Sequence, residues 1–241
     1  MRFIVIFLFF SSLMPFAQEK PLVIVELFTS EGCSSCPPAD RLLSEIVKKD
    51  SDEVEVVGLS FHVDYWDYIG WKDPYASKDF TIRQRAYARR FVNNTIYTPQ
   101  MVVNGEHEFV GSNRGHLSKA LRSEKETKLL KLKISSVKIE NGVLHAVVSG
   151  EDTSPSVLNV AVVEKGLSQN VTRGENRGRL LSHDNVVRVF DSRQFNGSDN
   201  AFRLKLPADL DLSKSSLVVY AQDQKNWFVQ AASKTELKSF E

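Results

Sequence analysis

Cysteine is scarce in this sequence. The 241 residues include two cysteines, Cys33 and Cys36, separated by Ser34 and Ser35. A single pair so close together cannot form the network of long-range disulfides that holds small secreted domains together. Closing so short a loop stabilises a fold by only about 2 kcal/mol, less than a longer bridge would. The 42% hydrophobic content must supply the core, and the cysteine pair is therefore a candidate for chemistry.

An excess of charge is also missing. Thirty-one lysines and arginines against 30 aspartates and glutamates give a net charge of +1. A chain without a basic excess has no electrostatic footprint for nucleic acid or for an anionic membrane surface. We therefore expect no nucleic-acid partner.

No apolar run is long enough to cross a bilayer, which takes about 18 to 20 residues. The run from Phe3 to Phe10 follows Arg2 and is followed by small and turn-forming residues up to Ala17. This pattern indicates a signal peptide over residues 1–17 and no permanent membrane anchor. We expect export to the periplasm or the extracellular space, where Cys33 and Cys36 can form a disulfide.

Helix and strand patterns alternate in the first half of the mature chain. The Asn104-Gly105 pair predicts a hairpin turn. The predicted elements are a strand at 22–28, a helix at 39–49, a strand at 54–61, a helix from near Pro74 that ends before Pro99, a hairpin of 100–104 and 107–110, and a helix at 116–124. This is the element order of the thioredoxin fold, and we assign it to residues 18–127.

The pattern changes near residue 128, where helical periodicity gives way to short alternating segments. Seven strands are predicted, near 130–139, 143–149, 157–164, 186–190, 201–206, 217–222 and 227–232. Short strands separated by turn signals are typical of a β-sandwich. The fold class is therefore an α/β thioredoxin-like domain followed by a β-sandwich-like domain at 128–241.

Cys33 and Cys36 fall between the first strand and the first helix. The helix N-terminus offers unpaired N–H groups and the positive end of the dipole, which lower a thiol pKa. We expect Cys33, nearer the loop, to be the exposed nucleophile and Cys36 to resolve the mixed disulfide. Glu31 opposes thiolate formation because it brings a like charge.

Further site residues are predicted around this pair. Pro99 is expected to follow a cis peptide bond against the dithiol, and Thr98 before it is expected to pair with substrate backbone. His62 and Asp64 end the second strand, at the sheet edge where α/β proteins place their sites. His62 is a candidate proton carrier or metal ligand, or else a capped histidine at a strand end.

Glu26 is the only charge in its strand. It is either buried beneath the dithiol with a raised pKa, ready to accept the proton of Cys36, or it points outward at a sheet edge.

The remaining polar and aromatic clusters allow two interpretations each. Trp66 belongs to an aromatic segment at 65–71 that either lines a peptide groove or packs on its own domain. Charged residues at 171–179 form a glycine-punctuated loop that could hold an anion, without the context of a phosphate loop. His183 and Arg188 are expected to help dock the two domains. Four arginines of one helix, whose spacing does not place them all together, are expected either to be solvated or to bind an acidic partner: Arg83, Arg85, Arg89 and Arg90.

Four stretches carry a resemblance to a known family. They are residues 26–40 around the cysteines, residues 61–74 with their aromatic cluster, residues 97–100 around Pro99, and Arg173-Gly174-Glu175-Asn176 with His183 and Asn185. Together they resemble the domain-of-unknown-function 1223 family of secreted bacterial proteins. The resemblance implies a thioredoxin-like amino-terminal fold, a β-rich carboxy-terminal part and export, and it assigns no reaction. The segment 98–105 also resembles glutaredoxins, whereas Gly32 stands where thioredoxins usually carry tryptophan.

These observations favour a thiol–disulfide oxidoreductase that acts on protein or small-molecule disulfides with a redox partner still to be identified. No cofactor is expected. A copper- or zinc-handling protein that uses Cys33, Cys36 and His62 is a second hypothesis. A non-catalytic thioredoxin-fold adaptor is the third.

Overall fold

The computed structural model describes residues 20–49, 51, 53–93, 95–153 and 155–240. The predicted signal peptide lies outside these residues. Elements of the first half are β1 (Leu22–Thr29), α1 (Pro37–Lys48), β2 (Glu55–His62), the 3-10 helix η1 (Asp64–Ile69), α2 (Lys78–Arg90), β3 (Gln100–Val103), β4 (His107–Val110) and α3 (Arg114–Ser123). Apart from η1, which the sequence patterns did not predict, each lies within a few residues of its predicted position, except that α2 begins later than Pro74.

The second half is built almost entirely of strands. After η2 (Glu124–Glu126) come β5 (Leu130–Lys131), β6 (Lys133–Glu140), β7 (Val143–Ser149), β8 (Ser156–Glu164), β9 (Leu167–Asn170), β10 (Leu180–His183), β11 (Val186–Phe195), β12 (Asn200–Lys205), η3 (Leu212–Lys214), β13 (Ser215–Asp223), β14 (Val229–Glu236) and η4 (Leu237–Phe240). The β9–β10 hairpin is an element that the sequence patterns did not predict.

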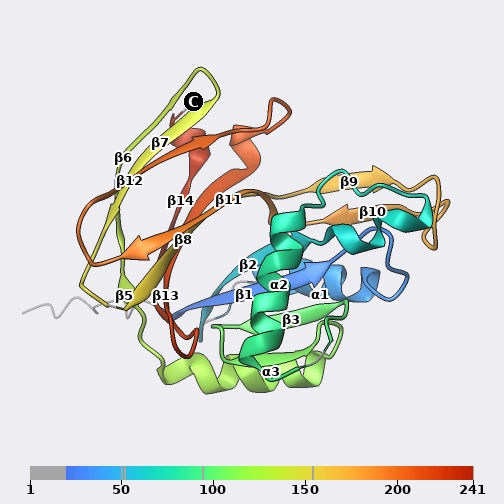
Figure 1. The fold of residues 1–241 in the computed structure, drawn as a ribbon, viewed down its shortest axis with the longest axis horizontal. Helices are drawn as coiled ribbons and strands as arrows, with labels where there is room; N and C mark the ends of the chain where they lie inside the picture. The colour runs from blue at the N-terminus through green and yellow to red at the C-terminus, as the bar shows by residue number, and fades with distance from the viewer. Residues whose placement is uncertain (1–19, 50, 52, 94, 154, 241) are drawn as a thin grey trace, which may run out of the picture.

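One mixed sheet of nine strands runs through the molecule in the order β4-β3-β1-β2-β11-β8-β13-β14-β5. In Figure 1, α1, α2 and α3 gather around β1, β2 and β3, and most strands of the second half fill the other side of the molecule, whereas β9 and β10 lie on the side of the helices. The strands β1 and β2 are parallel with Thr29 opposite His62, and β3 runs antiparallel to β1. The carboxyl ends of β1 and β2 therefore meet at one sheet edge, where the cysteines follow.

Alternate residues of β1 supply two different cores, as the period of a strand requires. Val23, Val25 and Leu27 pack with α1 and α3. Ile24 and Phe28 face α2 together with residues of β8, β11, β13 and β14. The helix α2 therefore lies in a core that both halves of the chain share.

A further apolar core lies entirely among residues of the second half. A three-stranded sheet, β12-β7-β6, contributes the apolar side chains of β7 and β12, which pack against those of β8 and β13. The larger sheet is continuous from β2 to β11 through the pairing of Ser60 with Val186. The protein is thus a mixed, sheet-rich α/β structure. The predicted boundary at residue 128 lies between η2 and β5, and strands from both sides of it share the nine-stranded sheet.

Among the described residues, no helix is long and apolar enough to cross a membrane.

Candidate functional site

Cys33 and Cys36 form a disulfide, with an S–S distance of 2.15 Å, in the turn that joins β1 to α1. The turn is closed by backbone hydrogen bonds from Cys33 N to the Ser30 oxygen and from Cys36 N to the Cys33 oxygen. Cys36 is the N-cap residue of α1, and Pro37 and Pro38 open the helix, where a missing N–H donor costs little. The pair thus lies at the positive end of the helix dipole, as predicted.

The expected exposure of Cys33 was wrong. Both cysteines are fully buried, and Ser34 and Ser35 between them are exposed. Two segments cover the turn. A Cβ atom on Gly32 would lie 3.0 Å from the Trp66 Cβ and 3.3 Å from the Ile69 Cδ1, so η1 packs directly on the backbone before Cys33.

The second covering segment is the loop of residues 171–179 from the far half of the chain. The buried Asn176 amide donates from Nδ2 to the backbone oxygens of Glu31 at 2.8 Å and Cys33 at 2.9 Å. The Ser34 N–H donates to the Glu175 carboxylate at 3.1 Å, and hydrogen bonds from Ser34 lower the pKa of Glu175. The charged loop thus holds the dithiol turn with its own side chains.

Pro99 lies beside the turn. The Thr98–Pro99 peptide bond is cis, as expected. The Ser35 hydroxyl is 3.5 Å from the Thr98 backbone oxygen, and the Trp66 indole donates to the Thr98 hydroxyl at 2.8 Å. The structure therefore brings Thr98, Pro99 and Trp66 together with the cysteines. Asp64 instead accepts a hydrogen bond from Thr81 in α2.

A buried cluster of two histidines and three carboxylates adjoins the dithiol turn. Its members are Glu31, Asp40, His62, Asp73 and His183. Asp73 Oδ2 accepts the Glu31 N–H at 2.8 Å and lies 2.7 Å from His62 Nδ1. His183 Nε2 lies 3.2 Å from Glu31 Oε1, and its Nδ1 lies 3.9 Å from Asp40 Oδ2.

The two imidazole rings pack edge to face with centroids 4.8 Å apart. His62 Nε2 and His183 Nδ1 have no hydrogen-bond partner among the described residues. Two unpaired ring nitrogens in a buried acidic cluster leave room for protons to be gained or moved.

Burial and pairing move the pKa values of this cluster in different directions. Burial raises the pKa of Asp40, and the nearby histidines only partly offset that effect. Burial also opposes a charge on His62, but the surrounding carboxylates, Asp73 foremost, together outweigh it and raise the pKa of His62. The same pairing lowers the pKa of Asp73 despite its burial. Between Asp40 and Asp73, Asp40 is thus the carboxyl group that favours its protonated form.

Glu26 is buried, one of its two predicted alternatives, yet it does not serve the dithiol. Its carboxylate accepts two hydrogen bonds from Arg83, at 2.6 and 2.8 Å, and one from the Tyr87 hydroxyl at 2.6 Å. With both oxygens occupied by these donors, the carboxylate is not placed to accept a proton from Cys36. The predicted solvation was wrong for Arg83, because a lone acid inside β1 requires a buried cation.

His183 and Arg188 have different roles in the contact between the halves. His183 reaches Glu31 in the first half. Arg188 forms ion pairs with Glu164 and Asp209 within the second half, and its guanidinium also lies over the Tyr75 ring, 5.4 Å from the centroid.

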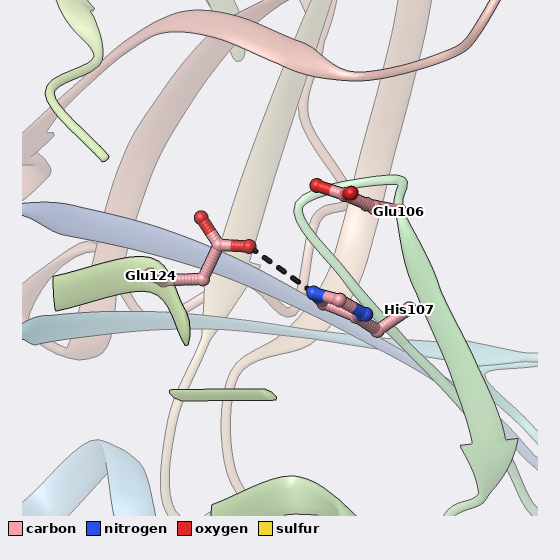
Figure 2. A group of neighbouring side chains, drawn as sticks. All are labelled: Glu106, His107 and Glu124. Carbon is pink, nitrogen blue, oxygen red and sulfur yellow. Dashed lines mark ion pairs between the residues drawn. The ribbon is translucent and has the colours of Figure 1, made fainter. Parts of the chain in front are cut away.

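The metal hypothesis gains no support from the geometry. Among the described residues, the group whose ligand atoms all lie within 4.8 Å of one another is Glu106, His107 and Glu124, not Cys33, Cys36 and His62. Figure 2 shows this group, in which His107 Nε2 lies 3.6 Å from Glu124. Glu124 opens η2, and the other two residues lie at the β3–β4 turn, which the antiparallel pairing of β3 with β1 places at the sheet end opposite Thr29. The group is therefore separate from the dithiol.

Sequence reasoning missed Asp40, Asp73 and Asn176 as site residues. No local periodicity distinguishes them from surface polar residues, because their burial depends on contacts between distant segments. All three do lie within stretches that carry the family resemblance. The resemblance was therefore the feature of the sequence that could have identified them as site residues.

Comparisons with known proteins agree with this architecture. The chain is 30% identical over 91 residues to a thioredoxin from Methanocaldococcus jannaschii, a match that covers 37% of this chain and 80% of the relative. A crystal structure of a protein from Agrobacterium tumefaciens matches 90% of this chain and 95% of its own, with a TM-score of 0.67 and 30% identity. A family profile described as "Protein of unknown function (DUF1223)" matches residues 24–222. The chain therefore belongs to the DUF1223 family.

Proposed function

We propose that this protein is an exported thiol–disulfide oxidoreductase that works through Cys33 and Cys36. The observation that carries the proposal is the position of the disulfide, which lies at the N-terminus of α1 with Thr98 and Pro99 beside it. Partial identity to a thioredoxin supports the same chemistry. In this proposal residues 18–127 are the thioredoxin-like unit. The β-sandwich-like part at 128–241 supplies the loop of residues 171–179 that covers the dithiol.

The reaction follows from the two positions. In the reduced protein the Cys33 thiolate attacks one sulfur of a substrate disulfide, which forms a mixed disulfide and releases the first substrate thiolate. Cys36 then attacks the Cys33 sulfur, which closes the Cys33–Cys36 bond and releases the second. Two electrons pass from the dithiol to the substrate, and the reverse sequence oxidises a substrate dithiol.

Access to the sulfur limits which substrates can react. Both cysteines are fully buried beneath η1 and the loop of residues 171–179. Exchange needs an approach to Cys33 in line with the disulfide, so one of these covers must move in the working cycle. We expect such a closed site to react with one defined partner protein and not with disulfides in general. Gly32 agrees with this expectation, because it stands where general reductases of the thioredoxin type usually carry tryptophan.

The burial of the disulfide also favours a second candidate, an adaptor whose disulfide never cycles. The reduction potential distinguishes the two. The mature protein is equilibrated in dithiothreitol or glutathione buffers, and free thiols are counted by alkylation and mass. We expect a value between about −120 and −270 mV, the range of exchange catalysts, whereas a value below about −300 mV would mark a structural bridge and support the adaptor.

Cysteine variants test the assigned roles. With the model disulfide dithiobis(nitrobenzoate), the reduced wild type should release two nitrothiobenzoates per protein. We expect Cys36→Ser to release one and to hold the other as a mixed disulfide, and Cys33→Ala to release neither at a comparable rate. Cys33→Ala can release one nitrothiobenzoate at most, through Cys36, and release of that one at the rate of the first wild-type phase would overturn the assignment of Cys33 as nucleophile.

A further inference from the structure

The proposed chemistry requires a group that receives the proton of Cys36, because only the thiolate can attack the mixed disulfide. Glu26 is excluded by its bonds to Arg83 and Tyr87. The buried cluster beside the dithiol turn holds other candidates, and a role for any of them in proton transfer rests on the proposed function.

Asp40 lies one helical turn after Cys36. Its backbone N–H donates to the Cys36 oxygen at 3.1 Å. Residues four apart share one face of a helix, with Cβ atoms about 5 to 6 Å apart. Helical side chains also lean toward the N-terminus, so the carboxyl group of Asp40 leans toward the turn that holds Cys36. Cys36 is fully buried and Asp40 is 5% exposed, so little water competes for the proton.

The surroundings of Asp40 fix its orientation without neutralising it by a permanent cation. Oδ1 accepts a hydrogen bond from the Thr29 hydroxyl at 2.8 Å. Oδ2 faces His183 Nδ1 at 3.9 Å, and the other nitrogen of that ring is 3.2 Å from Glu31. A carboxyl group that is hydrogen-bonded to a neutral hydroxyl and has no arginine or lysine bonded to it can exist in both protonation states, whereas one paired with arginine stays ionised.

We propose that Asp40 is the proton acceptor for Cys36, with the Thr29 hydroxyl fixing the carboxyl group and His183 acting on it through charge from 3.9 Å away. As the Cys36 sulfur attacks Cys33, the S–H proton passes to the Asp40 carboxylate, the Cys33–Cys36 bond forms, and the substrate thiolate leaves. In the reverse direction the Asp40 acid returns the proton to the Cys36 thiolate as the disulfide opens.

The oxidised state fits this step. Burial raises the pKa of Asp40 while the disulfide is closed, so the carboxyl group favours the protonated form that the transfer would leave behind. The titratable groups that face it are His183 from β10, His62 from β2 and Asp73 after η1. Glu31 before the cysteines reaches it through His183. The pH dependence of the step belongs to this set and not to Asp40 alone.

Stopped-flow reaction of the reduced protein with dithiobis(nitrobenzoate) tests the inference. The first release of nitrothiobenzoate reports Cys33 attack, and the second reports resolution by Cys36. In Asp40→Asn we expect an unchanged first phase and a second phase slowed about 100-fold at neutral pH. The deficit should shrink as the pH rises toward the pKa of the thiol itself. The matched control is Glu45→Gln, which removes an exposed carboxylate from the same helix.

A second phase equal in Asp40→Asn and wild type across the pH range would overturn the role of Asp40 and leave the oxidoreductase standing. A wild type that releases no nitrothiobenzoate would overturn the proposed function itself. His183→Gln should shift the pH dependence of the second phase and leave the first phase unchanged.

The stability of the oxidised protein separates a functional role from a structural one. Asparagine keeps an acceptor for Thr29 and removes a carboxyl group that is costly to bury, so oxidised Asp40→Asn should unfold at the same or higher urea than wild type at neutral pH. A purely structural Asp40 predicts a loss of stability instead. If the variant fails to fold, infrared difference spectra of the wild type decide the question: reduction should remove a carboxylic-acid carbonyl band, and an unchanged band would overturn the inference.

Discussion

Arg83 and Glu26 form a buried ion pair in the core that the two halves share. The guanidinium also donates to Tyr220 and Gln222, and it lies over several aromatic rings. The polar atoms around the pair thus come from β1, α2 and the second half of the chain. Such a pair is costly to break from one side, because the remaining charge stays buried.

Arg83→Met should therefore destabilise the protein by about 3 to 5 kcal/mol, as expected when one partner of a buried pair is removed. The free energy of unfolding in urea measures the effect. Arg85→Gln, on the exposed face of the same helix, is the control and should change stability by less than about 0.5 kcal/mol. Equal stabilities of the two variants would show that the pair contributes nothing.

The His62–Asp73 pair gives a pH dependence with a defined sign. The pKa of His62 is raised above 6.5, so its contribution is complete below the pKa of the unfolded chain and is lost as the pH rises through the higher folded value. The pKa of Asp73 is lowered from 3.8, so its contribution is lost only in acid. The advantage of wild type over His62→Gln in unfolding free energy should be largest near pH 5 and should shrink toward pH 9.

His116→Gln, at an exposed position of α3, is the control for this measurement. Its difference from wild type should stay nearly flat over the same pH range. A flat difference for His62→Gln as well would contradict the assigned pairing.

At the scale of residues, positions that depend on neighbouring residues in the sequence could be predicted, and contacts between distant residues could not. Cys33 and Cys36 follow a clear strand pattern and precede a clear helix pattern, so their position at the helix start could be predicted. The partners of Glu26 and Asp40 could not, because Arg83 and His183 reach them only after distant segments pack together. The predicted exposure of Cys33 was wrong for the same reason. Asn176, which helps to cover Cys33, lies 143 positions after it in the sequence.

At the scale of elements, the loop of residues 171–179 is the feature that most affects access to the dithiol. Asn176 bonds to two backbone oxygens of the turn, Glu175 accepts from Ser34, and Gly174 has a φ of +73° where an added Cβ would lie 3.1 Å from Ile69. The loop is therefore fitted to η1 as well as to the cysteines.

Asn176→Ala should loosen this cover. Two lost hydrogen bonds of about 1 kcal/mol each would make the open form at least about tenfold more populated. The first phase of reaction with dithiobis(nitrobenzoate) should accelerate accordingly. Arg173→Gln changes an exposed residue of the same loop and should leave the rate unchanged. Equal rates in the two variants would mean that another segment, such as η1, limits access.

The β9–β10 hairpin that carries this loop was not predicted, for a physical reason. Its strands have four residues each, too few to show a period, and the glycines and charges between them resemble an ordinary loop. The longer strands β8 and β13 were predicted because they alternate or run apolar over nine residues.

At the scale of the molecule, the two halves are joined by a continuous sheet and a common core. Ser60 of β2 pairs with Val186 of β11. The rings of Tyr87 and Trp227, one from each half, lie with centroids 4.9 Å apart. The sequence showed the change of pattern at residue 128 but not this junction, because strand pairing between distant segments leaves no local signature.

This junction predicts that the halves unfold together. Two variants report on them separately: Trp227→Phe keeps Trp66 and Trp71 in the first half, and the double change Trp66→Phe and Trp71→Phe keeps Trp227 in the second. In urea, with the disulfide intact, each variant should give the same midpoint by tryptophan fluorescence as by circular dichroism. Separate midpoints within one variant would show two independently stable domains. A fragment that ends at residue 127 gives a second test. We expect it not to fold, because β1 and α2 would expose Phe28, Phe80 and Tyr87 to water. A folded fragment would support two independently stable domains.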